Sequence, residues 1–75
     1  MELKQVKFFL NKTVYYDDGQ INIGQNSLNE YILSGCTLRK TRNERFFYQA
    51  ELKDPNLNSV IIVPLEKVKI TRFKD

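Results

Sequence analysis

The sequence predicts an all-β fold, mainly β in content: a small antiparallel barrel of five or six strands with a 3₁₀-like turn before the last strand. In residues 46–53 the apolar Phe46, Tyr48, Ala50 and Leu52 alternate with Phe47, Gln49, Glu51 and Lys53, which is the pattern of a strand with one buried face. Residues 60–63 are four β-branched residues in succession, as is typical of a strand covered on both sides. Short strands at this density close into a barrel, because an open sheet leaves apolar surface and edges exposed.

Length and composition bound the class of protein. The chain has 75 residues, which is room for one domain, residues 1–75. It holds one cysteine and no histidine, so neither a disulfide nor the common zinc ligand sets can form within it, and Cys36 is interpreted as a small core residue. An unpaired cysteine is typical of a reducing compartment. The N-terminus lacks the hydrophobic stretch of a signal peptide, and no apolar run approaches the ~20 residues of a spanning helix, so we expect a cytoplasmic protein without membrane contact.

Residues 1–12 leave strand and helix open. Apolar side chains at positions 3, 6, 10 and 14 follow helical spacing, whereas those at 6, 8, 10, 14 and 16 follow the spacing of a strand. We favour the strand, because Thr13–Tyr16 strongly prefers β structure and no capping residue precedes the helical alternative.

A hairpin is predicted at Asp18-Gly19, because a tight hairpin turn needs the positive backbone angles that glycine adopts freely. A loop of these two residues sets two apolar pairs opposite each other on one face: Tyr16 with Ile21 and Val14 with Ile23.

Residues 24–34 are polar at first and apolar later. Ser27 and Glu30 match a helix capping box, so we expect a loop with a short helical turn. The alternative is a long loop that leads into a strand at Tyr31. Residues 27–33 therefore stay open between strand and helix.

From Cys36 the β pattern returns, and a loop precedes Phe46. A three-residue loop, with Asn43 in the left-handed conformation, keeps the apolar side chains on one face, whereas an even-length loop would break that face. The odd loop sets two pairs opposite each other: Leu38 with Tyr48 and Cys36 with Ala50. The alternation then turns Phe46 toward the core and Phe47 outward.

The last third of the chain carries a turn and a strand end. Residues 54–58 have turn chemistry, and Pro64 ends the preceding strand because it has no N–H. Residues 64–67 predict a single 3₁₀-type turn. Residues 68–71 follow as a closing strand, with Val68 and Ile70 inward and Lys69 outward.

This order of elements resembles a Src-homology-three-like barrel or its relative, the Sm-like barrel, over about residues 3–72. The resemblance is one of architecture: a long connection over residues 16–33, three strands joined by two hairpins over 36–63, and the 3₁₀-like break at 64–67. Peptide-binding members hold proline-rich ligands in an aromatic groove with a tryptophan. This chain has no tryptophan, and Leu65 or Lys67 stands where such domains place a tyrosine, so polyproline binding is not carried over.

No catalytic constellation is visible. Without histidine the usual nucleophile–base pairs are absent, and Asp17-Asp18 beside Gly19 is interpreted as a turn. We expect no enzymatic activity, no cofactor and no metal site.

The features that point to a partner are basic and aromatic. A net charge of +3 permits a polyanionic partner without requiring one. Cationic side chains gather at the loop before Phe46, and a second basic group lies near the end of the chain; cations beside ring faces suit phosphate contacts and base stacking. The candidate binding residues are Arg39, Lys40, Arg42, Arg45, Phe47 and Lys69.

Two hypotheses follow. The first is a non-enzymatic interaction or assembly domain with a protein partner or a second copy of itself, contacted through outward aromatic side chains such as Phe47, Tyr15 and Phe73. The alternative is binding of DNA or RNA by the basic-aromatic hairpin, residues 39–48. A basic hairpin tip is also a common solvated turn that discourages edge pairing.

Overall fold

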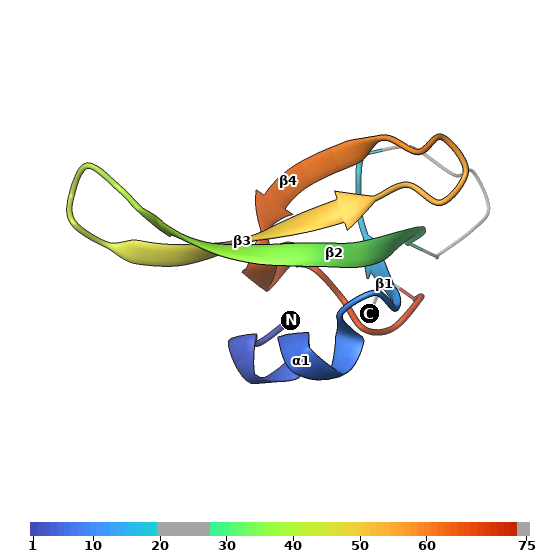
Figure 1. The fold of residues 1–75 in the computed structure, drawn as a ribbon, viewed down its shortest axis with the longest axis horizontal. Coiled ribbons are helices and arrows are strands. Elements are labelled where there is room, and N and C mark those ends of the chain that lie inside the picture. Colours follow the sequence, from blue (N-terminus) through green and yellow to red (C-terminus); the bar gives the residue numbers. More distant parts are fainter. Residues whose placement is uncertain (20–27, 74–75) are drawn as a thin grey trace.

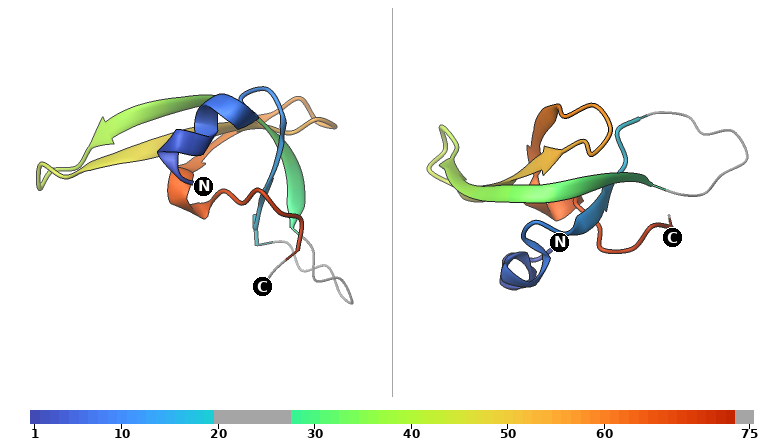
Figure 2. Two further views of the ribbon diagram at one scale, coloured as in Figure 1. Left: turned by 90° about the horizontal axis from the view of Figure 1, so that it is seen from below. Right: turned by 45° about the vertical axis from the view of Figure 1, so that its right-hand side comes forward.

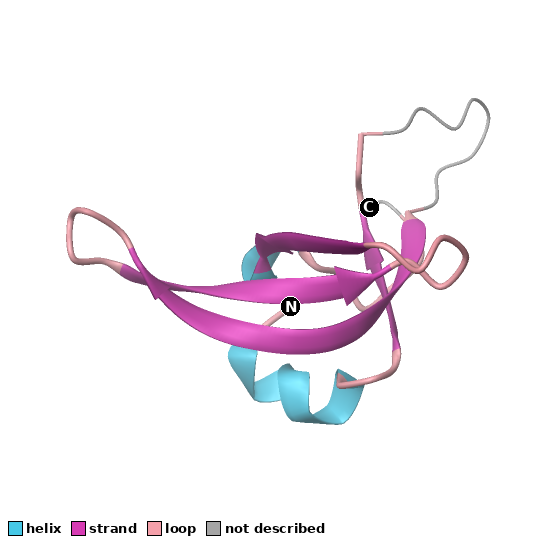
Figure 3. Cartoon of the chain, turned by 45° about the horizontal axis from the view of Figure 1, so that its top comes forward, coloured by secondary structure: helices cyan, strands magenta, loops and turns pink. Residues whose placement is uncertain are grey.

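The structure, a computed structural model, describes residues 1–19 and 28–73. Four strands form one antiparallel sheet in the order β1-β2-β3-β4 (Figure 1). Its elements are the 3₁₀ turn η1 (Leu3–Gln5), α1 (Val6–Phe9), β1 (Thr13–Tyr16), β2 (Asn29–Lys40), β3 (Phe46–Lys53), β4 (Val60–Pro64) and the 3₁₀ turn η2 (Leu65–Lys67). The sheet curls into a half-barrel (Figure 3). The mainly β fold is confirmed, with four strands in the described residues where five or six were expected.

The core lies on one face of this sheet, where η1 and α1 also pack (Figure 2). Every strand and η2 contribute to it; the buried side chains are Val14, Tyr31, Leu33, Ala50, Leu52, Val63, Leu65 and Val68. Met1, Val6 and Phe9 of the N-terminal segment pack against this cluster. The core is therefore built mostly from long-range contacts.

The hairpin between β2 and β3 has the predicted register: Leu38 lies opposite Tyr48 and Cys36 opposite Ala50. Its loop has the predicted odd length, because Thr41 N–H donates to the carbonyl oxygen of Arg45 at 2.8 Å. The left-handed residue is Glu44, with φ of 63°, and the expectation of Asn43 is wrong. Glu44 N–H donates to the Thr41 carbonyl at 3.0 Å, which makes Glu44 the last residue of the tight turn, and three-residue hairpins take their left-handed residue there.

β2 begins at Asn29, so the expected short helical turn is wrong for the described residues of 27–33, and the strand alternative is nearer the structure. β2 pairs with β1 along one edge and with β3 along the other. These two ladders override the local capping pattern. The register shifts between Leu33 and Gly35, which is a β-bulge. The bulge lets the strand change its buried face midway.

The N-terminal segment is helical over residues 3–9, so the favoured strand over residues 1–12 is wrong. The first turn is capped in a way that the sequence did not suggest: the Gln5 side chain accepts a hydrogen bond from the Glu2 backbone N–H at 2.9 Å. Helical spacing places Val6 and Phe9 against the core. The strand at Thr13–Tyr16 is confirmed.

The second strand of the hairpin predicted at Asp18-Gly19, with Ile21 and Ile23, lies outside the described residues. Gly19 has φ of 82°, and its N–H donates to Asp17 Oδ1 at 3.0 Å, as a turn at this point requires. Among the described strands, the partner of Val14 is Tyr31.

β4 is an edge strand, and the expectation that both its faces are covered is wrong. Val63 is buried and Ile61 packs on the core, but Val60 is 49% exposed and Ile62 is 56% exposed. Pro64 ends the strand and η2 follows, as predicted.

The expected strand over residues 68–71 is wrong: a bridge between Tyr15 and Lys69 holds this segment beside β1 without a continuous ladder. Tyr15 and Lys69 exchange two backbone hydrogen bonds of 2.8 Å. Val68 is buried and Lys69 is exposed, as predicted, whereas Ile70 is 41% exposed and does not point into the core. No helix in residues 1–19 or 28–73 is long and apolar enough to cross a membrane.

Candidate binding site

The hairpin of β2 and β3 extends beyond the rest of the sheet, because β4 pairs with β3 only as far as Gln49 (Figure 1). The apolar face of β3 is therefore covered at Ala50 and Leu52 and uncovered toward the hairpin tip. Ala50 and Leu52 are buried and Tyr48 is half-buried, but Phe46 is 65% exposed. The expectation that Phe46 points into the core is wrong for this reason.

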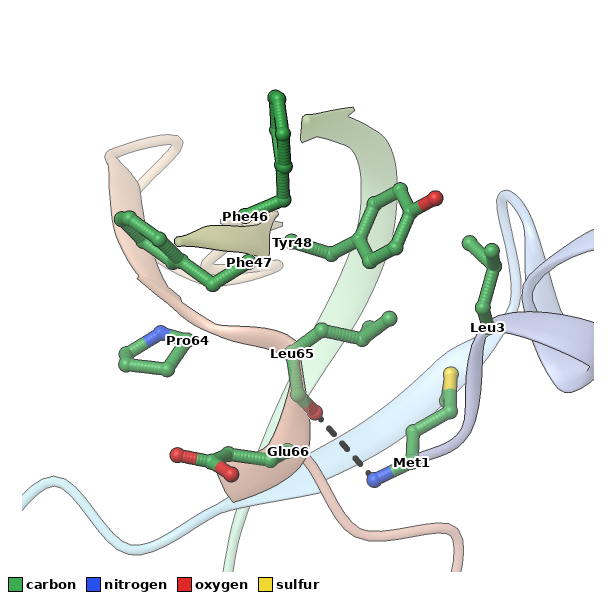
Figure 4. Close-up of a pocket in the computed structure, with 8 residues that line it drawn as sticks. All are labelled: Met1, Leu3, Phe46, Phe47, Tyr48, Pro64, Leu65 and Glu66. Atoms are coloured by element: carbon green, nitrogen blue, oxygen red, sulfur yellow. Dashed lines mark hydrogen bonds between the residues drawn. The ribbon is translucent and has the colours of Figure 1, made fainter. Parts of the chain in front are cut away.

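An open pocket of about 400 Å³ lies where the hairpin leaves the sheet. Its walls come from the N-terminal segment, from β3 and from the end of β4 with η2 (Figure 4); the lining residues are Met1, Leu3, Phe46, Phe47, Tyr48, Pro64, Leu65 and Glu66. The pocket exists because the chain turns into η2 after Pro64 and leaves the first residues of β3 without a neighbour on that side. Its lining is mostly apolar.

The N-terminus forms one wall of this pocket. The Met1 ammonium donates hydrogen bonds to the Leu65 carbonyl at 3.2 Å (Figure 4) and to the Val68 carbonyl. Partial burial lowers the pKa of this ammonium from 8.0, and repulsion by Lys69 lowers the pKa further. The two hydrogen bonds fix Met1, and with it Leu3, beside η2.

The structure brings five of the six candidate residues together on the hairpin. Arg39, Lys40, Arg42 and Arg45 are all exposed around its tip. Lys40 Nζ lies 3.8 Å from Glu44 Oε1 and 5.9 Å from the centroid of the Phe46 ring. Four cationic side chains against one carboxylate make this end of the hairpin positively charged.

Phe47 lies on the hairpin but is half-buried where an outward side chain is expected, and Lys69 lies on another segment. Phe47 lies opposite Arg39 in the ladder, and its half-buried ring lies near Pro64 in the pocket wall (Figure 4). Lys69 is on the segment bridged to β1, where it borders a separate hollow with Met1 and Glu66. Lys69 is therefore not part of the hairpin site.

Sequence reasoning missed most of the pocket. The alternation of β3 turns Phe46 toward the core, and the sequence places Leu65 only in a turn, because nothing local shows where β4 leaves the edge of β3. The available signal was the combination of an aromatic run at 46–48 with a strand-ending proline at 64. Once the register of β3 and β4 is known, these two features together predict that the aromatic side chains at the start of β3 have no neighbouring strand on the β4 side.

The Cys36 thiol lies away from this pocket. Cys36 is half-buried and packs against the core, and burial raises the pKa of its thiol. No cluster of three or more metal-binding side chains occurs in the part of the chain that the structure describes. The pocket offers apolar surface beside the cationic side chains of the hairpin.

Comparison with known proteins finds no match to this chain among family models, curated proteins or solved structures. The function is therefore argued from the pocket and the hairpin.

Proposed function

We propose that this chain is a non-enzymatic interaction domain that binds a segment of a partner protein in the pocket beside Phe46 and Phe47. The observation that carries the proposal is the pocket itself, an apolar hollow of about 400 Å³ with three consecutive aromatic residues in its wall. Binding sites are typically concave and mostly apolar, and aromatic side chains dominate the energetics of protein interfaces.

Exposed apolar side chains beside the pocket support a protein partner. Leu3 is 48% exposed, Leu38 is 50% exposed and Phe46 is 65% exposed. Isolated exposed apolar residues are ordinary, but Leu3 and Phe46 line one pocket, and Leu38 pairs with its third lining aromatic, Tyr48. A protein segment would remove all three side chains from water.

The experiment compares Phe46→Ser with Leu57→Ser. Both side chains are well exposed, at 65% and 76%, so neither substitution disturbs the core, but only Phe46 lines the pocket. Immobilised wild type and variants are incubated with lysate of the source cells, with and without nuclease treatment, and retained proteins are quantified by mass spectrometry. We expect Phe46→Ser to reduce the retained partner at least about tenfold and Leu57→Ser to leave it unchanged.

Two results would overturn the proposal. Equal retention by wild type and Phe46→Ser would show that the pocket does not bind the partner. Complete loss of retained protein after nuclease treatment would show that a nucleic acid had bridged the contacts.

Binding of DNA or RNA through the hairpin, residues 39–48, is a second candidate, favoured by the exposed Arg39, Arg42 and Arg45. It ranks second for three reasons. Lys40 forms an ion pair with Glu44, and Lys69 lies on a segment away from the hairpin. The ring of Phe47 is half-buried, so it is not free to stack on a base. These features interrupt the continuous basic groove with bare ring faces that a single strand needs.

This second candidate has its own test, a fluorescence titration with single-stranded oligonucleotides over a range of salt concentrations. Phosphate contacts require that affinity falls steeply with salt and that Arg42→Ala and Arg45→Ala each lower the slope by about one. Lys53→Ala, an exposed cation at the far end of β3, is the matched control. Absence of binding at low salt removes this candidate.

The expected closed barrel, like the Src-homology-three-like or Sm-like architecture, also stands as a proposal. We infer that residues 68–72, which form no regular strand, close the half-barrel by lying beside β1 and the start of β2. The bridge between Tyr15 and Lys69 supports this inference, as does the hydrogen bond of 2.6 Å from Leu28 N–H to the Arg72 carbonyl. The ion pair between Arg72 and Glu30 adds a third contact on the same path.

A further inference from the structure

We propose that the partner is an extended, acidic protein segment that binds as an added strand along Phe46–Tyr48 of β3. It would occupy the position beside β3 that β4 leaves at Pro64. This inference rests on the proposed function, since the added segment would fill the same pocket, and it names the conformation and the charge of the partner.

The first step is the open edge of β3. The ladder between β3 and β4 runs from Lys53 opposite Val60 to Gln49 opposite Pro64 and ends there. Phe46–Tyr48 therefore has β2 on one side and no strand of the described residues on the other. Pro64 has no N–H with which to continue the ladder, and η2 begins at the next residue.

The second step is the direction of the backbone groups. Thr41 N–H donates to Arg45 C=O at 2.8 Å, and at the other end of β3 Asp54 N–H donates to Ser59 C=O at 2.8 Å. In an antiparallel sheet hydrogen-bonded and non-hydrogen-bonded pairs alternate. Both bonds require that odd-numbered residues of β3 bond to β2 and that even-numbered residues face the β4 side. The backbone groups of Phe46 and Tyr48 thus point toward the open position.

The third step is that the pocket lies along this same edge. Tyr48 points toward Leu3 and Phe47 points toward Pro64, so the side chains of β3 flank the open position on both faces (Figure 4). An added strand places alternate side chains on these two faces. Three added residues span about 10 Å, which matches the three uncovered residues of β3. Backbone pairing with pockets for alternate side chains is how sheet edges bind peptides.

The fourth step is charge. The hairpin end of the open position is surrounded by exposed cations, Arg39, Arg42 and Arg45, whereas Glu66 borders its opposite end. Complementary potentials favour acidic residues of the segment at the hairpin end and disfavour them beside Glu66. A polyproline segment does not fit, because proline has no N–H to donate to an outward carbonyl of β3.

The experiment starts from a displayed library of random nine-residue peptides selected on the full chain. We expect enriched peptides with two or three aliphatic or aromatic residues next to a cluster of Asp and Glu. The best peptide is then synthesised with each central amide N-methylated in turn. Strand addition requires that methylation at alternate positions lowers affinity about tenfold or more and that methylation between them has little effect.

Variants and spectra locate the bound peptide. The double variant Arg42→Glu, Arg45→Glu should weaken binding about tenfold, and Lys12→Glu, an exposed cation off the hairpin, should not. The backbone amide signals of Phe46 and Tyr48 should show the largest shifts in nuclear magnetic resonance spectra when the peptide is added. Thermal unfolding checks that each variant is folded.

The outcomes separate this inference from the proposed function. Peptides that are lost with Phe46→Ser but are proline-rich, basic or insensitive to N-methylation would overturn strand addition and leave the pocket as the binding site. No enriched peptide, or binding that Phe46→Ser does not change, would overturn both proposals. Oligonucleotide binding at physiological salt without any peptide binding would assign the hairpin to a nucleic acid.

Discussion

Tyr31 is the polar group that the core has to accommodate. Its side chain is only 7% exposed, and its hydroxyl donates a hydrogen bond to Asp18 Oδ2 at 3.1 Å. Its ring meets that of Tyr16 edge to face, with centroids 6.3 Å apart. Tyr31 therefore joins the core to the end of β1 through one hydrogen bond and one aromatic contact.

The free energy of unfolding should depend on pH through the ionisation of the Tyr31 hydroxyl. Burial first, and then the hydrogen bond and the negative charge of Asp18, raise the pKa of Tyr31 from 10.0 to about 12. The unfolded chain loses this proton near pH 10, whereas the folded chain keeps it until about pH 12. Stability from this group is therefore complete below pH 10 and is lost as pH rises from 10 to 12, by roughly 2–3 kcal/mol in all.

Urea unfolding of wild type and Tyr31→Phe between pH 9 and about pH 12 measures this loss. Phenylalanine keeps the ring without the titrating hydroxyl, so the variant should lose less stability over the same interval. A phenolate absorbance titration of the folded protein that shows all four tyrosines ionising near their ordinary pKa would contradict the assignment.

Phe46 shows the limit of residue-scale prediction. The alternation of β3 assigns it correctly to the same face as Tyr48, Ala50 and Leu52. Exposure then rises along that face toward the hairpin tip, and Phe46 reaches 65%. A period-two pattern identifies a face, but whether anything covers that face depends on the length of the neighbouring strands.

At the scale of elements, local chemistry predicted turns better than it predicted strand partners. The turn at 54–58 forms as expected, with Asp54 Oδ1 accepting bonds from the N–H groups of Asn56 and Leu57 at 2.8 and 3.1 Å. The sequence leaves residues 27–33 open between strand and helix, because the two partners that decide for a strand, β1 and β3, are distant in sequence. For residues 1–12 the favoured strand is wrong and the helical alternative forms, because the apolar residues fit both periods and packing on the core decides between them.

The hairpin turn offers a sharp test of element-scale geometry. Glu44 is held at φ of 63°, which is unfavourable for a residue with a side chain and free of strain for glycine. We expect Glu44→Gly to raise the free energy of unfolding by about 0.5–1 kcal/mol, even though it removes the exposed contact with Lys40.

Asn43→Gly is the matched control, because Asn43 has no positive φ. It should leave stability unchanged or lower it slightly, through the greater freedom of glycine in the unfolded chain. Urea unfolding of the two variants against wild type measures the difference. If Asn43→Gly stabilised the protein and Glu44→Gly did not, the left-handed residue would be Asn43, as expected from the sequence, and not Glu44.

At the scale of the whole molecule, the half-barrel leaves two different surfaces open. One is the pocket beside the projecting hairpin, whose position could not be predicted because it depends on where β4 ends relative to β3. The other is the outer edge of β4, whose four β-branched residues the sequence did single out. The sequence predicted a strand buried on both sides, and the isolated chain buries one side only.

We expect the β4 edge to support self-association. Val60 and Ile62 are 49% and 56% exposed on an edge strand that carries no charged residue, and such edges pair readily with other strands. Sedimentation velocity should show a mass above the 8.9 kDa of one chain as concentration rises. Ile62→Lys should restore the monomer, because a charge on an edge strand opposes pairing, whereas Leu57→Lys, at a 76% exposed turn residue, should not. A wild-type protein that stays monomeric at the highest soluble concentration would show that β4 does not pair with a second copy of the chain. The exposed face of Val60 and Ile62 would then be left for a partner protein to cover.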